Sequence, residues 1–297
     1  MPRKFKSSDF VRQVLILAQT LNIDAILVQT DSQDDFTLIN ALRGREKIVW
    51  LTPQIQAQNI NPTGPDEILT LSLDSIRGSA IRSMGLLLAC LRGIIKPKEN
   101  ILCLYSSIAR KELDSLTITR PKDRLRIIRT MDLETIGRLF APEVFIRLVN
   151  ILTRFATEGR EGRPIGTIFV LGEPDKLQPY LKEMILNPCK GHPPELRNVF
   201  NNSFFETFRE LSALDGAFVI NRQGIVEGAG IYLSAPETPT KLSQGLGARH
   251  AAAAAITKHA DCITMVLSES SGNISIFHDS EALFEIELHQ GREWRFT

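Results

Sequence analysis

The first 120 residues alternate between short apolar runs and longer segments whose apolar residues recur at helical spacing. The short runs predict buried strands at residues 24–30, 47–52, 67–73, 100–106 and 116–119. Helical spacing covers residues 10–21, where Ser8 or Asp9 can cap the helix, and residues 76–93. Strands separated by helices pair in parallel, so this part predicts an open parallel-sheet α/β domain.

An arginine-rich stretch follows Pro121, and its apolar residues recur at the spacing of an amphipathic helix. We expect this helix to run from Pro142, at the first helical position, to Glu158, with Gly159 ending it. A basic RNA-binding helix is an alternative, but acidic residues dilute the positive charge. A connecting helix that packs through one apolar stripe is favoured.

The pattern changes again from residue 164 onward. An apolar run predicts a strand at residues 165–171, and two pairs of short runs around glycine turns predict hairpins at 217–229 and 264–278. An alanine-rich helix is expected between the hairpins, at residues 248–260. The predicted parts are an N-terminal α/β domain at 1–121, a helical connector at 122–160 and a mixed-sheet α/β domain at 161–297.

Composition narrows the classes of function. The 297 residues include 35 Lys and Arg and 34 Asp and Glu, which gives a net charge of +1. So small a charge argues against a protein that binds nucleic acid mainly through its overall electrostatic field. The longest strongly apolar run, about residues 85–91, is far shorter than the ~20 residues of a membrane helix. The basic N-terminus lacks the features of a signal peptide. We expect a cytoplasmic protein with no nucleic-acid and no membrane partner.

The four cysteines lack the spacing of a metal site, and Cys90, Cys103 and Cys262 lie in apolar runs. We expect buried free thiols, which fit a reducing compartment.

The N-terminal half carries no nucleotide fingerprint. Neither G-x-x-x-x-G-K-[ST] nor G-x-G-x-x-G stands between its first strand and helix. The polar loop at residues 31–35 is acidic and would repel phosphate. It can hold a cation or a ligand amine, but a solvated loop is favoured.

Three polar clusters in the last part carry the candidate chemistry. Residues 215–217 place a carboxylate and a glycine at a strand start, where a ligand can approach the backbone, although Asp-Gly is also a common turn. Residues 245–250 open the alanine helix with glycines, Arg249 and His250, which suit a phosphate, and a purely structural helix is an equal alternative. Residues 268–272 add a carboxylate and hydroxyls, or form a polar hairpin loop. Together they indicate metal-assisted nucleotide chemistry.

The order and spacing of these clusters resemble the diadenylate cyclase (DAC) domain family, to which the N-terminal domain of DisA belongs. The family motifs are D-G-A, G-[TA]-R-H about thirty residues later, and S-E in the next strand, which stand here at residues 215–217, 247–250 and 268–269. Residues 166–172, 187–191 and 230–233 are also family-like, so the likeness covers about residues 164–288. The whole architecture is similar to archaeal-type, DacZ-like cyclases, whose N-terminal domain looks like the C-terminal domain of pyruvate kinase.

The resemblance implies an enzyme that condenses two ATP into cyclic di-AMP and two pyrophosphates, with Mn²⁺ or Mg²⁺ as cofactor. Two domains in a homo-oligomer would face each other, so that each 3′-hydroxyl meets the opposite α-phosphate. The implied catalytic residues are Asp215, Arg249, His250 and Glu269, of which Asp215, His250 and Glu269 would bind the metal. The implied nucleotide-binding residues are Gly216, Ala217, Leu233, Gly247, Ala248, Arg249 and Ser268.

The chain departs from the family pattern at three positions. Ala248 and Ala251 stand where the commonest pattern has Thr and a second Arg, and Ser270 stands where it has Glu. A hydroxyl and a guanidinium that would touch phosphate are therefore missing, and Lys241 or Arg222 are candidates to compensate. A second hypothesis is an adenine-nucleotide sensor with weak or no catalysis. A structural scaffold is disfavoured because three polar motifs coincide in one domain.

Overall fold

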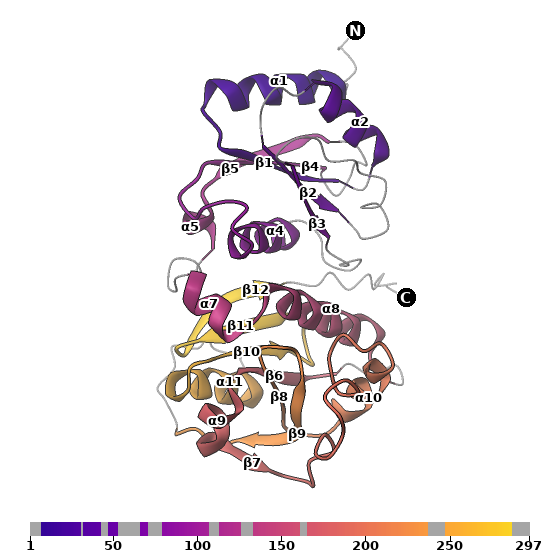
Figure 1. The fold of residues 1–297 in the computed structure, drawn as a ribbon, viewed down its shortest axis with the longest axis vertical. Helices are drawn as coiled ribbons and strands as arrows, with labels where there is room; N and C mark the ends of the chain where they lie inside the picture. Colours follow the sequence, from indigo (N-terminus) through magenta and orange to yellow (C-terminus); the bar gives the residue numbers. More distant parts are fainter. Residues whose placement is uncertain are drawn as a thin grey trace, which may run out of the picture. The chain divides into compact units, whose positions relative to one another are not determined.

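Two compact units, Met1–Leu133 (unit 1) and Glu134–Thr297 (unit 2), make up the computed structural model, and each is built on its own sheet (Figure 1). The predicted α/β fold class is confirmed, whereas the predicted domain limits stay predictions. The structure describes residues 7–30, 32–42, 47–52, 66–70, 79–106, 113–125, 133–160, 165–236 and 247–286.

Unit 1 contains a five-stranded sheet in the order β3-β2-β1-β4-β5. Its strands are β1 (Ala25–Gln29), β2 (Ile48–Thr52), β3 (Glu67–Thr70), β4 (Ile101–Tyr105) and β5 (Ser115–Thr119). Its helices include α1 (Ser7–Thr20), α2 (Gln33–Leu42), α4 (Ser79–Leu91) and α5 (Pro121–Arg124). The five predicted strands are confirmed, and the predicted start of the helix at 76–93 lies outside the described residues.

The sheet of unit 1 is not wholly parallel. β1 pairs in parallel with β2 and β4, and β2 with β3, but β5 runs antiparallel to β4. The connection at residues 106–114 is shorter than the dozen or more residues that a parallel crossover needs. The prediction of parallel pairing therefore holds for β1 to β4 and is wrong for β5.

The acidic loop of unit 1 is only partly a loop. Residue 31 lies outside the described residues, and α2 already begins at Gln33. Asp35 is 5% exposed and accepts a hydrogen bond of 2.6 Å from the hydroxyl of Thr30. The prediction of a solvated loop is wrong for Asp35, because this hydrogen bond and the positive end of α2 stabilise a buried carboxylate.

Unit 2 contains a seven-stranded mixed sheet in the order β12-β11-β10-β6-β8-β9-β7. Its strands are β6 (Thr167–Gly172), β7 (Leu181–Glu183), β8 (Ala217–Ile220), β9 (Val226–Leu233), β10 (Cys262–Leu267), β11 (Ile274–His278) and β12 (Glu281–Ile286). Its helices include α7 (Leu133–Leu139), α8 (Pro142–Glu158), α9 (Pro174–Leu177), α10 (Phe204–Leu211) and α11 (Ala248–His259). The predicted strand, both hairpins and the alanine helix are confirmed, and β7, α9, α10 and β12 were not predicted.

Helices cover both faces of the unit 2 sheet. α8 begins with Pro142 and ends at Gly159, whose φ of 63° suits glycine, as the sequence predicts. Aromatic rings of α8 and α10 pack against those of β6 and β8, for example Phe208 against Phe218 at 4.4 Å between ring centroids. On the other face, the small side chains of α11 join the apolar cluster of β6 and β10. Both faces of β6 are therefore buried, as its continuous apolar run requires.

The cysteine prediction is confirmed. Cys90, Cys103, Cys189 and Cys262 are free thiols and are all buried. Burial raises the pKa of Cys90 and Cys262 to about 12. Across the described ranges, no helix is long and apolar enough to cross a membrane.

Candidate active site

Strand directions bring the three sequence motifs of unit 2 to one edge of the sheet. β8 runs parallel to β6, and β10 runs antiparallel to β6. The start of β8, just after Asp215, therefore lies at the same edge as the end of β10, just before Glu269. Arg249, in the first turn of α11, reaches both carboxylates at this edge.

Arg249 forms the centre of the candidate site. Its Nη1 donates to Glu269 Oε2 at 3.0 Å, and its Nη2 lies 3.4 Å from Asp215 Oδ1. The side chain of Asp215 is 82% exposed and that of Glu269 is 58% exposed, whereas that of Arg249 is 37% exposed. One guanidinium thus holds two solvent-accessible carboxylates, and the three groups together carry one negative charge.

These ion pairs are weak enough to be exchanged for a ligand. Exposed ion pairs are worth only about 0–1 kcal/mol each, because water screens them and ordering two side chains costs entropy. A guanidinium forms stronger, bidentate hydrogen bonds with a phosphate group. Arg249 can therefore turn from the carboxylates to a phosphate, which frees Asp215 and Glu269 for a cation.

Gly166, just before β6, makes room for this arrangement. A Cβ atom added at Gly166 would lie 2.9 Å from Arg249 Nη1 and 2.9 Å from the Cβ of Glu269. Both distances are shorter than real Cβ contacts. A side chain at Gly166 would thus displace the groups that form the site.

Gly216 is required by its backbone as well as by its surroundings. Its φ is +113°, which L-residues rarely adopt, and an added Cβ would lie 2.7 Å from the backbone N of Ile231. The glycine lets the turn after Asp215 lie directly against β9. Ala217, the next residue, is fully buried, so its side chain belongs to the core.

The other predicted nucleotide-binding residues surround this edge in different ways. Gly247 precedes α11, and none of the described residues has an atom within 4 Å of a Cβ added there, while Ala248 is exposed in the first turn. The Ser268 hydroxyl contacts its own turn, accepting from the N–H of Ser271 at 3.3 Å. Leu233 is buried in the apolar cluster at the end of β9.

His250 is buried, whereas the two carboxylates that it was predicted to join are exposed. Its ring lies 6.1 Å from that of Phe277, and burial lowers the pKa of its imidazole despite the opposing charge of Glu285. Within the part of the chain that the structure describes, no group of three or more His, Cys, Asp or Glu side chains is placed to hold a metal. The structure therefore does not assemble the predicted metal trio.

The two carboxylates alone still fit a hard divalent cation. Mg²⁺ is commonly held by one or two carboxylates together with the phosphates of a substrate, and it keeps several waters. Asp215 and Glu269 are exposed and share Arg249, so they match such a site once a nucleotide supplies phosphate oxygens. The residues present fit a cation held jointly with a substrate.

Residues 154–282 match the family model described as "DisA bacterial checkpoint controller nucleotide-binding" (DAC). This chain contains a DAC domain. It is 27% identical to a diadenylate cyclase of Methanocaldococcus jannaschii, over 93% of this chain and 95% of that protein. It is also 28% identical to a diadenylate cyclase of Haloferax volcanii, over 66% and 71% of the two chains. This chain is also similar to the crystal structure of a DacA double mutant from Staphylococcus aureus. The two are 27% identical over 47% of this chain and 84% of that chain, with a TM-score of 0.31.

The sequence motifs did not single out every residue that lies at or beside the candidate site. Gly166 belongs to a family-like segment, but only the contact with Arg249 and Glu269 shows why a glycine stands there. Ile185 carried no signal, because it lies in a segment without a motif. It packs over Gly230 of β9 beside the turn at Asp215.

Proposed function

We propose that this chain is a diadenylate cyclase, which condenses two ATP into cyclic di-AMP and two pyrophosphates. The observation that carries the proposal is the pairing of Arg249 with both Asp215 and Glu269. Three motifs that lie far apart in the sequence thereby meet at one edge of the sheet. They supply a guanidinium that can bind phosphate and two carboxylates that can bind a metal. The DAC family match and the diadenylate cyclase relatives support this assignment.

The reaction asks the protein mainly to align groups and to stabilise charge. Each 3′-oxygen forms a bond to the α-phosphorus of the opposite ATP, and the bond between the α-phosphorus and the bridging oxygen breaks. Pyrophosphate leaves with that bond's electron pair. In this proposal Asp215 accepts the proton of the 3′-hydroxyl, because it is the exposed carboxylate at the start of β8.

Arg249 and the carboxylates then have separate tasks. Arg249 leaves its two carboxylates and binds phosphate oxygens, stabilising the negative charge of the transition state. Asp215 and Glu269 would hold the divalent cation, Mn²⁺ or Mg²⁺, which neutralises phosphate charge and acidifies the attacking hydroxyl. His250, buried against Phe277, supports the start of α11 in this scheme rather than binding the cation.

The product's symmetry requires two sites. Each ATP supplies both a nucleophile and an electrophile, so one site with one ATP cannot close the ring. Two copies related by a twofold axis use the same residues twice, which is an isologous contact. We therefore propose a homo-oligomer with facing DAC domains, acting on ATP in the cytoplasm.

A nucleotide sensor with little catalysis is the second candidate. Ala248 and Ala251 are both exposed in the first turn of α11, where a hydroxyl and a second guanidinium would otherwise reach phosphate. Binding without turnover would follow if Arg249 alone cannot stabilise the transition state.

One experiment separates the two candidates. Purified protein is incubated with ATP and either Mn²⁺ or Mg²⁺, and the products are resolved by chromatography. We expect cyclic di-AMP from the wild type and none from Asp215→Asn, because an amide neither neutralises a divalent cation nor accepts a proton. The control is Asp279→Asn, an exposed aspartate that pairs with Lys258, and this variant should keep full activity. ATP binding without product would support the sensor, and normal turnover by Asp215→Asn would refute the assigned site.

A further inference from the structure

Two glycines on β9 receive the segment that follows β7. The N–H of Met184 donates to the carbonyl of Gly230 at 3.2 Å, so residues 184–187 continue along the edge of β9. A Cβ at Gly230 would lie 2.9 Å from Cγ1 of Ile185, and a Cβ at Gly228 would lie 3.4 Å from Nδ2 of Asn187. Gly230 thus lets the segment pack directly on the strand, whereas a Cβ at Gly228 would be in ordinary contact with Asn187.

Ile185 lies next to the candidate active site. A Cβ added at Gly230 would touch Ile185, and it would also lie 4.0 Å from the carbonyl oxygen of Asp215. Gly216 in turn lies against the peptide that joins Gly230 to Ile231. Ile185 is 42% exposed, so it presents apolar surface to solvent beside the Asp215–Gly216 turn.

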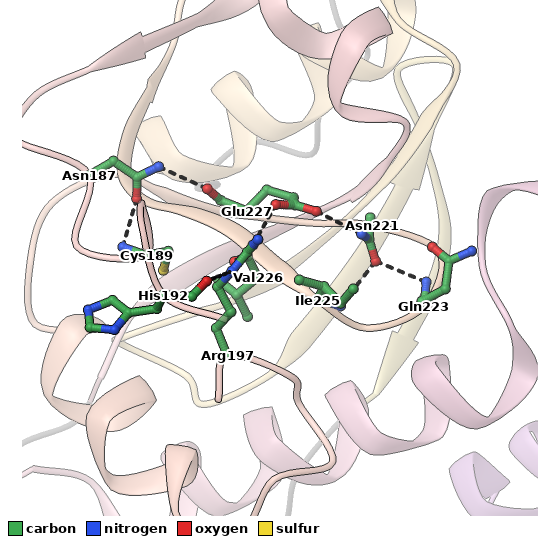
Figure 2. Close-up of polar contacts among 9 residues, drawn as sticks. All are labelled: Asn187, Cys189, His192, Arg197, Asn221, Gln223, Ile225, Val226 and Glu227. Atoms are coloured by element: carbon green, nitrogen blue, oxygen red, sulfur yellow. Dashed lines mark hydrogen bonds and ion pairs between the residues drawn. The ribbon is translucent and has the colours of Figure 1, made fainter. Parts of the chain in front are cut away.

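A polar network holds this segment in place (Figure 2). Asn187 Nδ2 donates to the carbonyl of Glu227 at 2.8 Å, and Asn187 Oδ1 accepts from the N–H of Cys189 at 3.0 Å. The Glu227 carboxylate accepts from Asn221 at 2.8 Å and pairs with Arg197. Figure 2 shows that these side chains converge on Glu227 from the loop after β7 and from the β8–β9 hairpin.

Arg197 connects the far end of the same loop to β9. It donates to the carbonyls of Val226 at 2.7 Å and His192 at 3.0 Å, in addition to Glu227. The side chains of Arg197 and Glu227 are only 17% and 29% exposed, so removing one partner leaves a shielded charge unpaired. The network therefore fixes both ends of the loop that begins with Ile185 and Asn187.

We propose that Ile185 contacts the purine base of the bound nucleotide and that Glu227, with Arg197 and Asn187, positions it. An apolar side chain beside the Asp215–Gly216 turn suits the flat face of a base. The phosphates and the metal require the charged groups at the same edge, which leaves this apolar surface for the base. This inference rests on the proposed function. It assigns Ile185 to substrate binding and Glu227 to a positioning role that acts through Ile185.

The first test compares neighbouring residues. Ile185→Ala should raise the KM for ATP about fivefold and leave kcat within about twofold, because it removes contact made equally in the ground and transition states. Ile185→Val should restore most of the affinity. Leu186→Ala is the matched control, since Leu186 is 92% exposed and should leave both constants unchanged. An unchanged KM in Ile185→Ala would overturn the proposal.

The second test asks whether Glu227 acts through Ile185. Glu227→Gln should raise KM in the same direction, and Ile185→Ala combined with Glu227→Gln should show the KM of Ile185→Ala alone. Glu158→Gln, which breaks the exposed pair with Arg154, is the control and should change nothing. Independent, additive effects would overturn the positioning role.

A binding measurement separates this inference from the proposed function. Equilibrium binding of a fluorescent ATP analogue is followed in the same variants. If the wild type binds the analogue but forms no cyclic product, the proposed function fails, while weaker binding by Ile185→Ala still supports the base contact. Equal binding by wild type and Ile185→Ala would overturn the contact whether or not the protein is a cyclase.

Discussion

At the residue scale, Arg249 connects two carboxylates that stand 34 and 20 positions away in the sequence. Its neighbours in the first turn of α11, Ala248 and Ala251, offer no polar group to a phosphate. Arg249 therefore carries a larger share of phosphate binding than it would in a site with three polar side chains.

We expect Arg249→Ala to lower the rate of cyclic di-AMP formation more than about tenfold, or ~1.4 kcal/mol, because a charge-assisted contact is lost. Arg249→Lys should recover only part of the rate, since an ammonium keeps the charge but lacks the rigid planar fork with which a guanidinium binds two phosphate oxygens. Initial rates over a range of ATP concentrations, which give both KM and kcat, test both variants. Unchanged affinity and rate in Arg249→Ala would show that this side chain does not face the nucleotide.

Gly166 gives a second prediction at this scale. Gly166→Ala should lower activity about tenfold, because the new methyl group displaces Arg249 or Glu269 at the contacts of 2.9 Å. Gly137→Ala, in α7, is the matched control and should keep full activity, because no atom of the described ranges lies within 4 Å of the added Cβ. Full activity in Gly166→Ala would mean that the arrangement of Arg249 and Glu269 is not used in catalysis.

At the element scale, an aromatic layer fixes α8 and α10 on the sheet of unit 2. Phe208 of α10 lies at its centre and packs on Phe218 at 4.4 Å, on Phe169 at 5.0 Å and on Phe155 at 5.9 Å. These contacts join both helices to β6 and β8, the strands whose starts lie at the candidate active site. The layer therefore supports the position of Asp215.

Phe208→Ala should lower the free energy of unfolding of unit 2 by about 3–5 kcal/mol, because it removes a fully buried ring and leaves a cavity. Phe200→Ala is the control, since Phe200 is 49% exposed and its loss should cost less than about 0.5 kcal/mol. Urea unfolding followed by circular dichroism measures both changes. Equal stability of the two variants would contradict the packing described for α10.

At the scale of the whole molecule, catalysis depends on an encounter between two copies. With 35 basic and 34 acidic residues, the chain has little net charge to keep copies apart. We expect a stable oligomer in sedimentation measurements and a turnover per subunit that falls when the protein is diluted until it dissociates. A monomer whose turnover per subunit stays constant down to nanomolar concentration would contradict facing sites.

Local patterns were sufficient to predict most elements. β2 is a run of four apolar residues and a threonine, all of them buried, and α8 is bounded by Pro142 and Gly159. Such elements are predictable because burial and backbone preference act over a few neighbouring residues. The DAC motifs are short and ordered along the chain, so the sequence alone indicates the family. β7 and α10 escaped prediction, because three strand residues and eight helical residues give too short a pattern.

Contacts between distant segments needed the tertiary structure. The direction of β5 and the meeting of Asp215 with Glu269 depend on strand order and register, which no local pattern encodes. His250 shows the same limit within one helix. The alanines at residues 251–255 have no contrast between polar and apolar faces, so the sequence cannot say which side of α11 is buried. The packing of that helix on β6 and β10 determines which side is buried. It places His250 in the interior and leaves Arg249 at the site.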